Sequence, residues 1–261
     1  MNYSGILPFV RYFLFSRHRK GHGIHSPFVF HLVSEVFRNK IDPGIVFTIE
    51  SLRKELISSR ELITVNDLGS GAQKRKPNLR KVSEIARSSS VPRKYGILLS
   101  NLSAEFGKTA ILELGTSFGI STMYMAAATN ATVHTVEGCS SAADIAAACF
   151  RKAGLNNIRL HRGAFDDVLP AFKNEMPAPG LVFIDGNHRK DPLVKYCGEI
   201  AGFSDDQTVI VIDDIHSSAE MESAWEEVKR IGKVTLSVDI FRMGFLFFRK
   251  GLDHLSYTVR Y

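Results

Sequence analysis

The stretch ILELGTSFGIST, residues 111–122, passes from an apolar run through a carboxylate into a loop of small residues. Glu113 precedes the loop, and Gly115 and Gly119 allow its backbone to approach a ligand closely. A second carboxylate, Glu137, ends the next apolar run, 24 residues beyond Glu113. A carboxylate at the tip of a second strand is well placed to bind the two hydroxyls of a ribose. The spacing therefore predicts a nucleoside-binding loop.

The loop sequence also restricts the ligand. It reads G-T-S-F-G, which is neither G-x-G-x-x-G nor G-x-x-x-x-G-K-[ST]. The first of those patterns binds a dinucleotide pyrophosphate, and the second binds a nucleoside triphosphate. An adenosine ligand without phosphates, carrying a charged amino-acid tail, fits better, and Glu113 would offer its charge to the ammonium group.

A near-echo of this loop, VNDLGSGAQK, runs from residue 65 to 74. It also has an acid, Asp67, before its glycines. A basic stretch with a proline follows it, and no second strand with an acid comes after. We interpret this segment as a turn, with a secondary ligand or lid role as the alternative.

Short apolar runs alternate with helical patterns after residue 109. The runs at 110–114, 132–136, 180–184 and 208–212, with a weaker one at 158–162, are typical of buried parallel strands. Residues 234–241 and 244–250 form two more strands, separated only by Arg242 and Met243, which indicates a hairpin. We predict an α/β fold: a doubly wound seven-stranded sheet of five parallel strands plus a C-terminal antiparallel hairpin.

Residues 1–105 are predicted to be a mostly helical, basic extension that packs on the core. Ser26 and Pro27 form a typical helix start. Residues 1–100 hold 17 Lys and Arg against 7 Asp and Glu, whereas 101–261 hold 16 against 20. The basic surface is either simply solvated or attracts an anionic substrate, nucleic acid or a membrane surface. Residues 106–251 are the predicted core domain, and 252–261 are a tail.

The overall composition is that of a globular protein, with 44% apolar and 23% charged residues. No apolar run reaches the ~20 residues needed to cross a bilayer. The three cysteines are scattered, which argues against a disulfide framework or a zinc site. Without a recognisable export signal, we expect reduced thiols in a cytoplasmic protein.

Several motifs in residues 92–250 occur in the order seen in one enzyme class. They are PRKYGILLSNL, ILELGTSFGIST, TVEG, GAFDDVLP, LVFIDGNH and VIVIDDIH. This succession resembles class I S-adenosylmethionine (SAM)-dependent methyltransferases. More narrowly, it is similar to the O-methyltransferases of the catechol and caffeoyl-CoA type and to the metal-dependent sugar O-methyltransferases.

The resemblance implies cofactor roles for particular residues. Glu113 and 115–117 would surround the methionine part, Ser121 its carboxylate, Glu137 the ribose, and 165–166 the adenine. The full implied set is Glu113, Gly115, Thr116, Ser117, Gly119, Ser121, Glu137, Gly138, Ala164, Phe165, Asp166 and Asp185.

Three aspartates follow the fourth and fifth predicted strands. Asp185, Asp213 and Asp214 could supply the oxygen ligands that a divalent cation such as Mg²⁺ prefers. Such a cation would bind the acceptor hydroxyl and lower its pKa. The alternative is that the aspartates cap helices or order loops.

Better caps for both following helices are present further along the chain. Asp191 precedes Pro192, and Ser217 with Glu220 has the spacing of a capping box. The three aspartates are therefore not needed as helix caps, and we predict that they bind a metal ion.

Histidines near these aspartates are candidates for proton transfer. His188 follows Asp185 by three residues, where the resemblance places a lysine base in catechol-type enzymes and a histidine in the sugar enzymes. We predict His188 as general base with Asp185 as its catalytic partner, with a backbone-bonded loop histidine as the alternative. His216 is a ligand, a substrate contact or a polar loop residue. His22 and His25 have no obvious third ligand.

The predicted function is metal-assisted O-methylation of a small hydroxylated molecule, with SAM and possible Mg²⁺ as cofactors, by a protein that could be a homodimer. One alternative is a metal-independent methyltransferase acting on nucleic acid or another anionic substrate. Against nucleic acid, the fourth strand is followed by IDGNH, without the Asn/Asp-Pro-Pro-aromatic stretch of enzymes that methylate base amino groups. A non-catalytic cofactor-binding protein is the other alternative, which the intact acids argue against.

Overall fold

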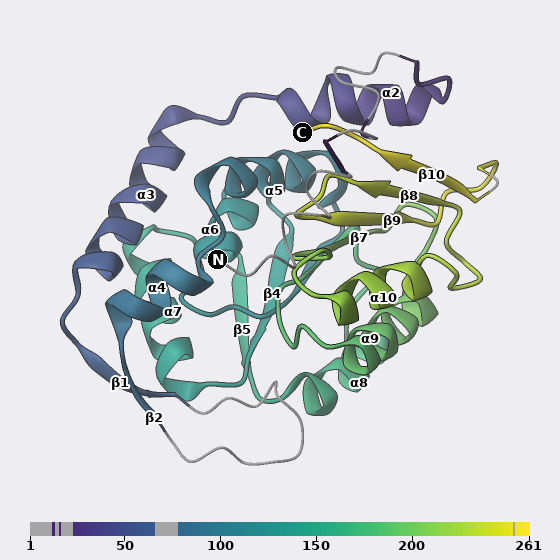
Figure 1. Cartoon of the computed structure of the whole chain (residues 1–261). Helices are drawn as coiled ribbons and strands as arrows, with labels where there is room; N and C mark the ends of the chain where they lie inside the picture. The colour runs from purple at the N-terminus through teal and green to yellow at the C-terminus, as the bar shows by residue number, and fades with distance from the viewer. Residues whose placement is uncertain (1–11, 14–15, 17–22, 66–77, 253) are drawn as a thin grey trace. The chain divides into compact units, whose positions relative to one another are not determined.

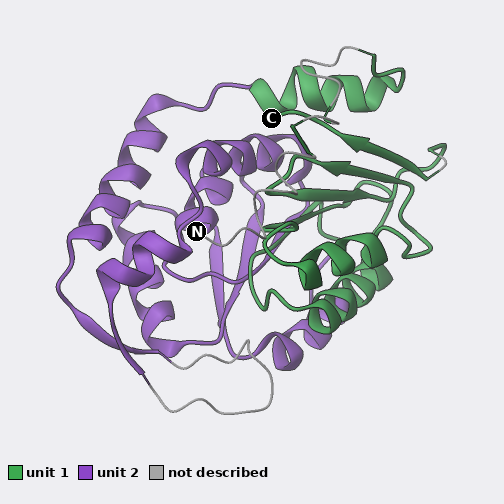
Figure 2. Ribbon diagram, in the orientation of Figure 1, with its two compact units in different colours: residues 1–38, 178–261 green, residues 39–177 purple. Residues whose placement is uncertain are grey.

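The protein is described by a computed structural model that covers residues 12–13, 16, 23–65, 78–252 and 254–261. It divides into two compact units, one of residues 39–177 and the other of residues 1–38 with 178–261 (Figure 2). This division differs from the boundaries at 105 and 251 that the sequence suggested, and those remain a proposal about folding units.

Three adjacent parallel strands form the sheet of the 39–177 unit: β3 (Ala110–Leu114), β4 (Thr132–Glu137) and β5 (Ile158–Arg162) (Figure 1). Every residue of β3 is buried, as the continuous apolar run predicted. In the register of the sheet, Glu113 pairs with Thr135 and Glu137 with Arg162. The carboxyl ends of the three strands therefore share one edge.

Helices of this unit are α3 (Pro43–Ser58), α4 (Val82–Ser89), α5 (Arg93–Phe106), α6 (Ile120–Ala126), α7 (Ser140–Lys152) and α8 (Phe165–Glu175). Helices α5 and α6 pack closely at Gly96, where an added Cβ would come within 2.5 Å of the Tyr124 ring. The Tyr124 hydroxyl donates to Glu50 Oε1 of α3 at 2.8 Å. Helices α3 and α5 are thus anchored to α6, the helix that follows the glycine loop.

A small hairpin interrupts the region predicted to be mostly helical. Strands β1 (Leu62–Val65) and β2 (Asn78–Lys81) pair antiparallel, and Val65 lies opposite Asn78. Both strands lie within residues 1–105, which the sequence predicted to be mostly helical. Apart from Val65, the near-echo loop lies outside the described residues.

The other unit contains the strands β6 (Leu181–Ile184), β7 (Val209–Ile212), β8 (Leu236–Asp239), β9 (Gly244–Phe247) and β10 (Leu255–Thr258). Their order across the sheet is β10-β8-β9-β7-β6. The pairs β6–β7 and β10–β8 are parallel, whereas β7–β9 and β8–β9 are antiparallel. The parallel strands and the C-terminal hairpin of the predicted fold are confirmed. Strand β10 is an addition, formed by residues we had assigned to the tail.

Helices of the second unit are α2 (Pro27–Ser34), the short 3₁₀ helix η3 (Val36–Arg38), α9 (Lys190–Phe203) and α10 (Ala219–Val228). Ser26 caps α2 as predicted, since its side chain accepts from the Val29 N–H. No helix among the described residues is both long and apolar enough to cross a membrane.

The sequence analysis assigned Asp191 and Ser217 as the N-caps of the two helices that follow the aspartates, and both assignments were wrong in detail. The N-cap of α10 is Ser218, whose hydroxyl accepts from the Met221 N–H, and α9 begins after Arg189 with no side-chain cap. The reason is that α10 begins one residue later than the capping-box pattern suggested. Neither N-cap is Asp185, Asp213 or Asp214, so those three still have another role.

Candidate functional site

The Glu113 carboxylate is fully buried beneath the glycine loop. It accepts hydrogen bonds from the hydroxyls of Ser121, Thr122 and Thr135, all between 2.5 and 2.6 Å. Burial raises the pKa of Glu113 to about 7, although these hydroxyls oppose the rise. The arrangement does not support the expected contact of Glu113 with an ammonium group, because its oxygens point into the protein. The Ser121 hydroxyl is likewise turned to Glu113, so neither side chain faces a ligand directly.

Three backbone positions in the loop adopt left-handed conformations. The φ angles are 107° at Gly115, 49° at Ser117 and 80° at Gly119. A Cβ at Gly119 would lie 2.3 Å from the Phe150 ring, so only glycine fits there. The N–H groups of Gly115 and Thr116 both donate to the Val136 carbonyl, which fixes the loop against the end of β4.

The Glu137 carboxylate joins the loop to the end of β4. Its Oε2 accepts the Ser117 N–H at 2.7 Å, and its Oε1 accepts the Cys139 N–H at 2.8 Å. Burial raises the pKa of Glu137, and these backbone hydrogen bonds counteract that rise. The Ser117 hydroxyl is also 2.8 Å from the hydroxyl of Ser89 on α4, a contact that sequence reasoning missed.

The predicted adenine segment is tied to the same edge of the sheet. The Gly163 N–H donates to the Glu137 carbonyl at 3.0 Å, and Ala164 is the N-cap of α8. Phe165 and Asp166 therefore begin the helix that follows β5. The structure thus gathers the predicted cofactor residues of this unit on one edge, with Glu137 between the loop and the start of α8.

The buried Glu113 predicts a pH-dependent stability. Its folded-state pKa lies above the ordinary value of 4.5, so the folded protein is destabilised as pH rises from about 4.5 through about 7. Glu113→Gln should remove this loss, which amounts to about 3 kcal/mol at ~1.4 kcal/mol per pKa unit. Urea unfolding between pH 4 and 8 measures it. Glu175→Gln, at an exposed carboxylate, should keep the wild-type slope, and an identical slope in Glu113→Gln would contradict the prediction.

The aspartates after β6 and β7 lie in the other unit. Because the two strands are adjacent and parallel, Asp185 and Asp213 end at the same edge, and the Asp213 N–H donates to the Ile184 carbonyl at 3.0 Å. The Asp213 side chain is fully buried, and Arg242 holds both of its oxygens. Nε donates to Oδ1 at 2.9 Å, and Nη2 donates to Oδ2 at 2.6 Å. Nη2 is also 3.5 Å from Asp214 Oδ1.

These aspartates do not fit the divalent cation that the resemblance implied. Both oxygens of Asp213 are engaged by a guanidinium, and burial raises the pKa of Asp213 while Arg242 opposes the rise. Within the described part of the chain, no group of three His, Cys, Asp or Glu side chains is arranged to hold a metal ion.

Sequence reasoning placed Arg242 in a turn and gave it no role. The predicted hairpin at this turn was the signal that could have indicated a role, because β9 runs antiparallel to β7 and pairs Gly244 with Ile212. The β8–β9 turn therefore returns to the carboxyl end of β7. The Ile215 N–H donates to the Arg242 carbonyl at 3.2 Å, which fixes the turn beside the aspartates.

His188 lies close to Asp185, as the predicted catalytic pair requires. Its Nε2 is 3.6 Å from Asp185 Oδ1, and its side chain is 39% exposed, so a substrate can reach it. Between them, Asn187 has a φ of 53° and donates from Nδ2 to the Tyr196 hydroxyl. Its buried Oδ1 has no hydrogen-bond partner among the described residues, which makes it an acceptor site that the sequence did not indicate.

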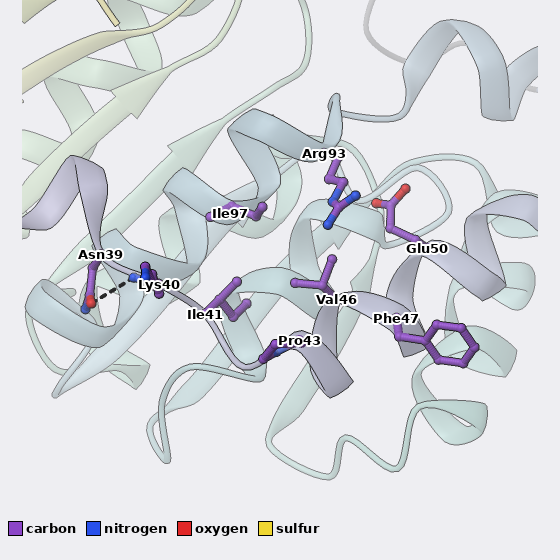
Figure 3. Close-up of a pocket in the computed structure, with 9 residues that line it drawn as sticks. All are labelled: Asn39, Lys40, Ile41, Pro43, Val46, Phe47, Glu50, Arg93 and Ile97. Atoms are coloured by element: carbon purple, nitrogen blue, oxygen red, sulfur yellow. Dashed lines mark hydrogen bonds between the residues drawn. The ribbon is translucent and has the colours of Figure 1, made fainter.

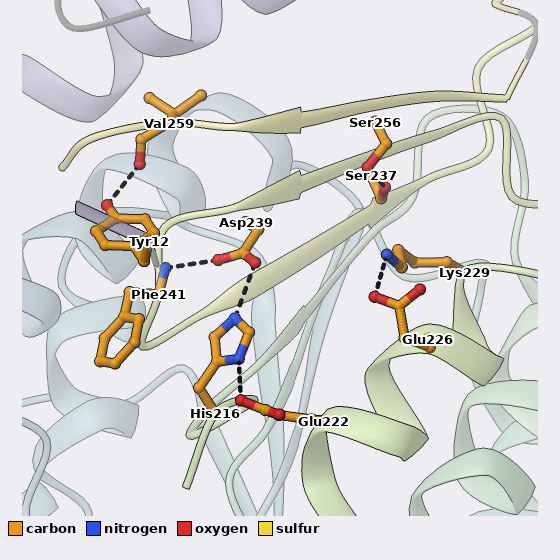
Figure 4. A network of polar contacts seen from close by, with 10 residues as sticks. All are labelled: Tyr12, His216, Glu222, Glu226, Lys229, Ser237, Asp239, Phe241, Ser256 and Val259. Carbon is orange, nitrogen blue, oxygen red and sulfur yellow. Dashed lines mark hydrogen bonds and ion pairs between the residues drawn. The ribbon is translucent and has the colours of Figure 1, made fainter. Parts of the chain in front are cut away.

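His216 belongs to a network of polar contacts (Figure 4). Its Nε2 is 2.9 Å from Asp239, its Nδ1 is 3.1 Å from Glu222, and its ring stacks on Phe241. Burial lowers the pKa of His216, but the two carboxylates outweigh burial and the pKa is raised. Both ring nitrogens are engaged, so of the three roles considered, the structural loop residue agrees best.

The same network predicts that His216 stabilises the protein in its charged form. Because its folded-state pKa is above 6.5, the stabilisation is present below about 6.5 and is lost as pH rises through the folded-state value. His216→Gln should lower the free energy of unfolding by ~1–3 kcal/mol at pH 6 and by less at pH 9. His25→Gln, at an exposed histidine, is the control for thermal unfolding. A loss that grows with pH would contradict the assignment.

A separate groove lies at the start of α3 and along α5, with a volume of about 580 Å³ (Figure 3). Lys40 and Arg93 supply positive charge there, and Phe47 is 75% exposed. The lining residues are Asn39, Lys40, Ile41, Pro43, Val46, Phe47, Glu50, Arg93 and Ile97. None belongs to the predicted cofactor set.

Residues 112–215 match a family model, Methyltransf_24, that is described as a methyltransferase domain. This range begins inside β3 and ends just after the Asp213-Asp214 pair. The sequence of residues 112–215, less than half of the chain, is therefore similar to a methyltransferase domain.

Solved structures of methyltransferases share the fold of this chain. TomG, an O-methyltransferase from Streptomyces achromogenes in complex with SAM, is 19% identical, with a TM-score of 0.57 over 80% of this chain and 91% of TomG. An O-methyltransferase from Bacillus cereus in complex with S-adenosylhomocysteine (SAH) is 20% identical, with a TM-score of 0.54 over 84% and 96%. An SAH-bound methyltransferase from Podospora anserina is 14% identical, with a TM-score of 0.57 over 87% and 97%. A search of curated proteins gave no match.

The match over residues 112–215 confirms the resemblance to class I SAM-dependent methyltransferases, and the solved structures confirm the α/β fold. The sheet is mostly parallel and contains the predicted C-terminal antiparallel hairpin, β8–β9.

Proposed function

We propose that this methyltransferase transfers the methyl group of SAM to a hydroxyl oxygen of a small molecule. The observation that carries the proposal is Glu137, whose carboxylate lies at the end of β4 and is held to the glycine loop through the Ser117 N–H. A ribose diol needs such an acceptor pair. O-methyltransferases among the proteins of similar fold support oxygen as the acceptor.

The cofactor contacts divide between side chains and backbone. Glu137 would accept the ribose hydroxyls, and Phe165 and Asp166 would contact the adenine. Because the Thr116 side chain is buried and bonded to Thr135, the loop would offer backbone carbonyls to the methionine part. Glu113 and Ser121 would act by holding the loop in shape. Asp185 and Asn187 Oδ1 remain proposed acceptors for hydrogen bonds from bound molecules.

Methyl transfer from a sulfonium is an in-line displacement. The acceptor oxygen forms a bond to the methyl carbon, the carbon–sulfur bond breaks, and its electron pair stays on sulfur. The hydroxyl proton passes to the imidazole ring of His188, and Asp185, whose Oδ1 is 3.6 Å from His188 Nε2, stabilises the imidazolium that forms.

Cofactor binding and transfer can be tested together. We expect SAH to bind in a calorimeter, and we expect a panel of catechols, flavonols and sugars incubated with SAM to yield a product one CH₂ heavier. Transfer to a base amino group of nucleic acid, with none to the hydroxylated panel, would overturn the proposal. Absence of SAH binding would instead favour a protein without methyltransferase activity.

An anionic acceptor is the second candidate, favoured by Lys40 and Arg93 in the groove beside α3 and by the 17 basic residues of the first hundred. If the acceptor is nucleic acid, its affinity should fall steeply with salt.

We also propose a cytoplasmic location, and we propose that the protein can form a homodimer.

A further inference from the structure

We propose that Arg242 takes the place of a divalent cation at the aspartates after β6 and β7, so that this methyltransferase acts without a divalent metal ion. The metal-independence of catalysis rests on the function proposed above. The occupation of the aspartates by a guanidinium does not, since it follows from the contacts of Arg242 alone.

The Arg242–Asp213 pair occupies both oxygens of the aspartate. Two parallel hydrogen bonds, at 2.9 and 2.6 Å, join the guanidinium to both oxygens of a carboxylate that has no exposed surface. Such paired contacts are the strongest that a carboxylate makes with a side chain. A magnesium ion would need one of those oxygens at about 2.0–2.1 Å. It would have to displace the guanidinium, and separating a buried pair is strongly unfavourable.

The backbone of the β8–β9 turn places Arg242 beside Asp213. The Arg242 carbonyl accepts from the Ile215 N–H, and its N–H donates to the Ile240 carbonyl at 3.1 Å. The preceding residue, Phe241, has a φ of 74°, and its N–H is held by Asp239 Oδ1 at 2.7 Å. The side chain therefore rises from a tightly bonded turn at the carboxyl end of β7.

The positive charge of Arg242 acts on all three aspartates. One guanidinium lies within ion-pair distance of Asp213 and Asp214, and Asp185 also acts on it electrostatically. A cation supplied by the chain thus meets the same three aspartates that we had predicted to bind a metal. Under this arrangement, His188 removes the acceptor proton without help from a bound cation.

Manganese binding, followed by electron paramagnetic resonance, tests the occupation without any activity measurement. Wild-type protein should show no stoichiometric Mn²⁺ site at millimolar concentration. Arg242→Met, which keeps the bulk of the side chain but removes its charge, should gain one Mn²⁺ site that fills at concentrations roughly tenfold or more below the millimolar range, because carboxylate oxygens become available to the ion. The double variant Arg242→Met/Asp213→Asn should lose that site.

A stoichiometric wild-type site that Asp213→Asn abolishes would overturn the proposal, as would a folded Arg242→Met that gains no site. If Arg242→Met does not fold, the wild-type titration alone decides. Methyl transfer in the presence of EDTA should equal transfer with added Mg²⁺. Loss of transfer in EDTA would overturn metal-independence, whereas absence of transfer in every condition, with wild type still binding no Mn²⁺, would count against the O-methylation proposal alone.

Discussion

Glu137→Ala is expected to weaken SAH binding by about 100-fold or more, because hydrogen bonds from two ribose hydroxyls to a charged acceptor contribute ~1.5–3 kcal/mol each. The substitution also removes the acceptor of the Ser117 and Cys139 N–H groups. The loop loses its attachment to β4, so the effect should exceed that of removing an ordinary surface carboxylate. Calorimetry with SAH measures the change.

Two further variants separate binding from loop structure. Glu137→Gln keeps one acceptor oxygen and should lose less affinity than the alanine variant. Glu175→Ala, at an exposed position on α8, should bind SAH like the wild type. Near-normal affinity in a folded Glu137→Ala protein would remove the observation on which the cofactor assignment depends.

His188→Ala is expected to lower kcat by ~10²–10⁴-fold, the usual contribution of a general base. SAH affinity should not change, because the proposed role of His188 is to accept a proton from the acceptor hydroxyl. Asp185→Asn should give a smaller decrease, since Asp185 acts by stabilising the charged imidazole 3.6 Å away. Steady-state methyl transfer, measured with the acceptor found in the panel, checks both.

His25→Ala is the matched control, because His25 is an exposed histidine of the same unit. The fall in kcat of His188→Ala should shrink at high pH, where more of the hydroxyl is already ionised. Unchanged kcat in His188→Ala would return this histidine to the alternative of an ordinary loop residue.

The sheet could be predicted because its strands have the simplest sequence signal. Residues 110–114 and 158–162 are strands with the predicted bounds, since short apolar or alternating runs end abruptly at polar residues. The β1–β2 hairpin was missed because two four-residue strands with exposed Leu62 and Leu79 carry little hydrophobic pattern. The hairpin is held by backbone pairing between residues 62–65 and 78–81, and the spacing of apolar residues along the sequence does not indicate such pairing.

The sequence predicted where the site residues lie in the fold, but it did not predict the directions in which their side chains point. The types and spacing of Glu113 and Glu137 placed both at the right strand ends. The sequence could not show that three hydroxyls enclose Glu113, because Thr135 comes from the neighbouring strand. Arg242 was missed for a related reason: its contact with Asp213 joins residues 29 apart through antiparallel pairing. Sequence motifs link a strand to the residues that follow it directly, whereas Arg242 reaches Asp213 through the β8–β9 hairpin.

Strand β10 has a practical consequence for handling the protein. It pairs with β8, whose first three residues are buried, and the Leu255 and Val259 N–H groups donate to carbonyls at either end of β8. If residues 255–259 were trimmed, the backbone of β8 would be left as an open edge that can pair with other molecules. A shortened protein would consequently tend to aggregate during purification, and affinity tags are better added after Tyr261 than substituted for these residues.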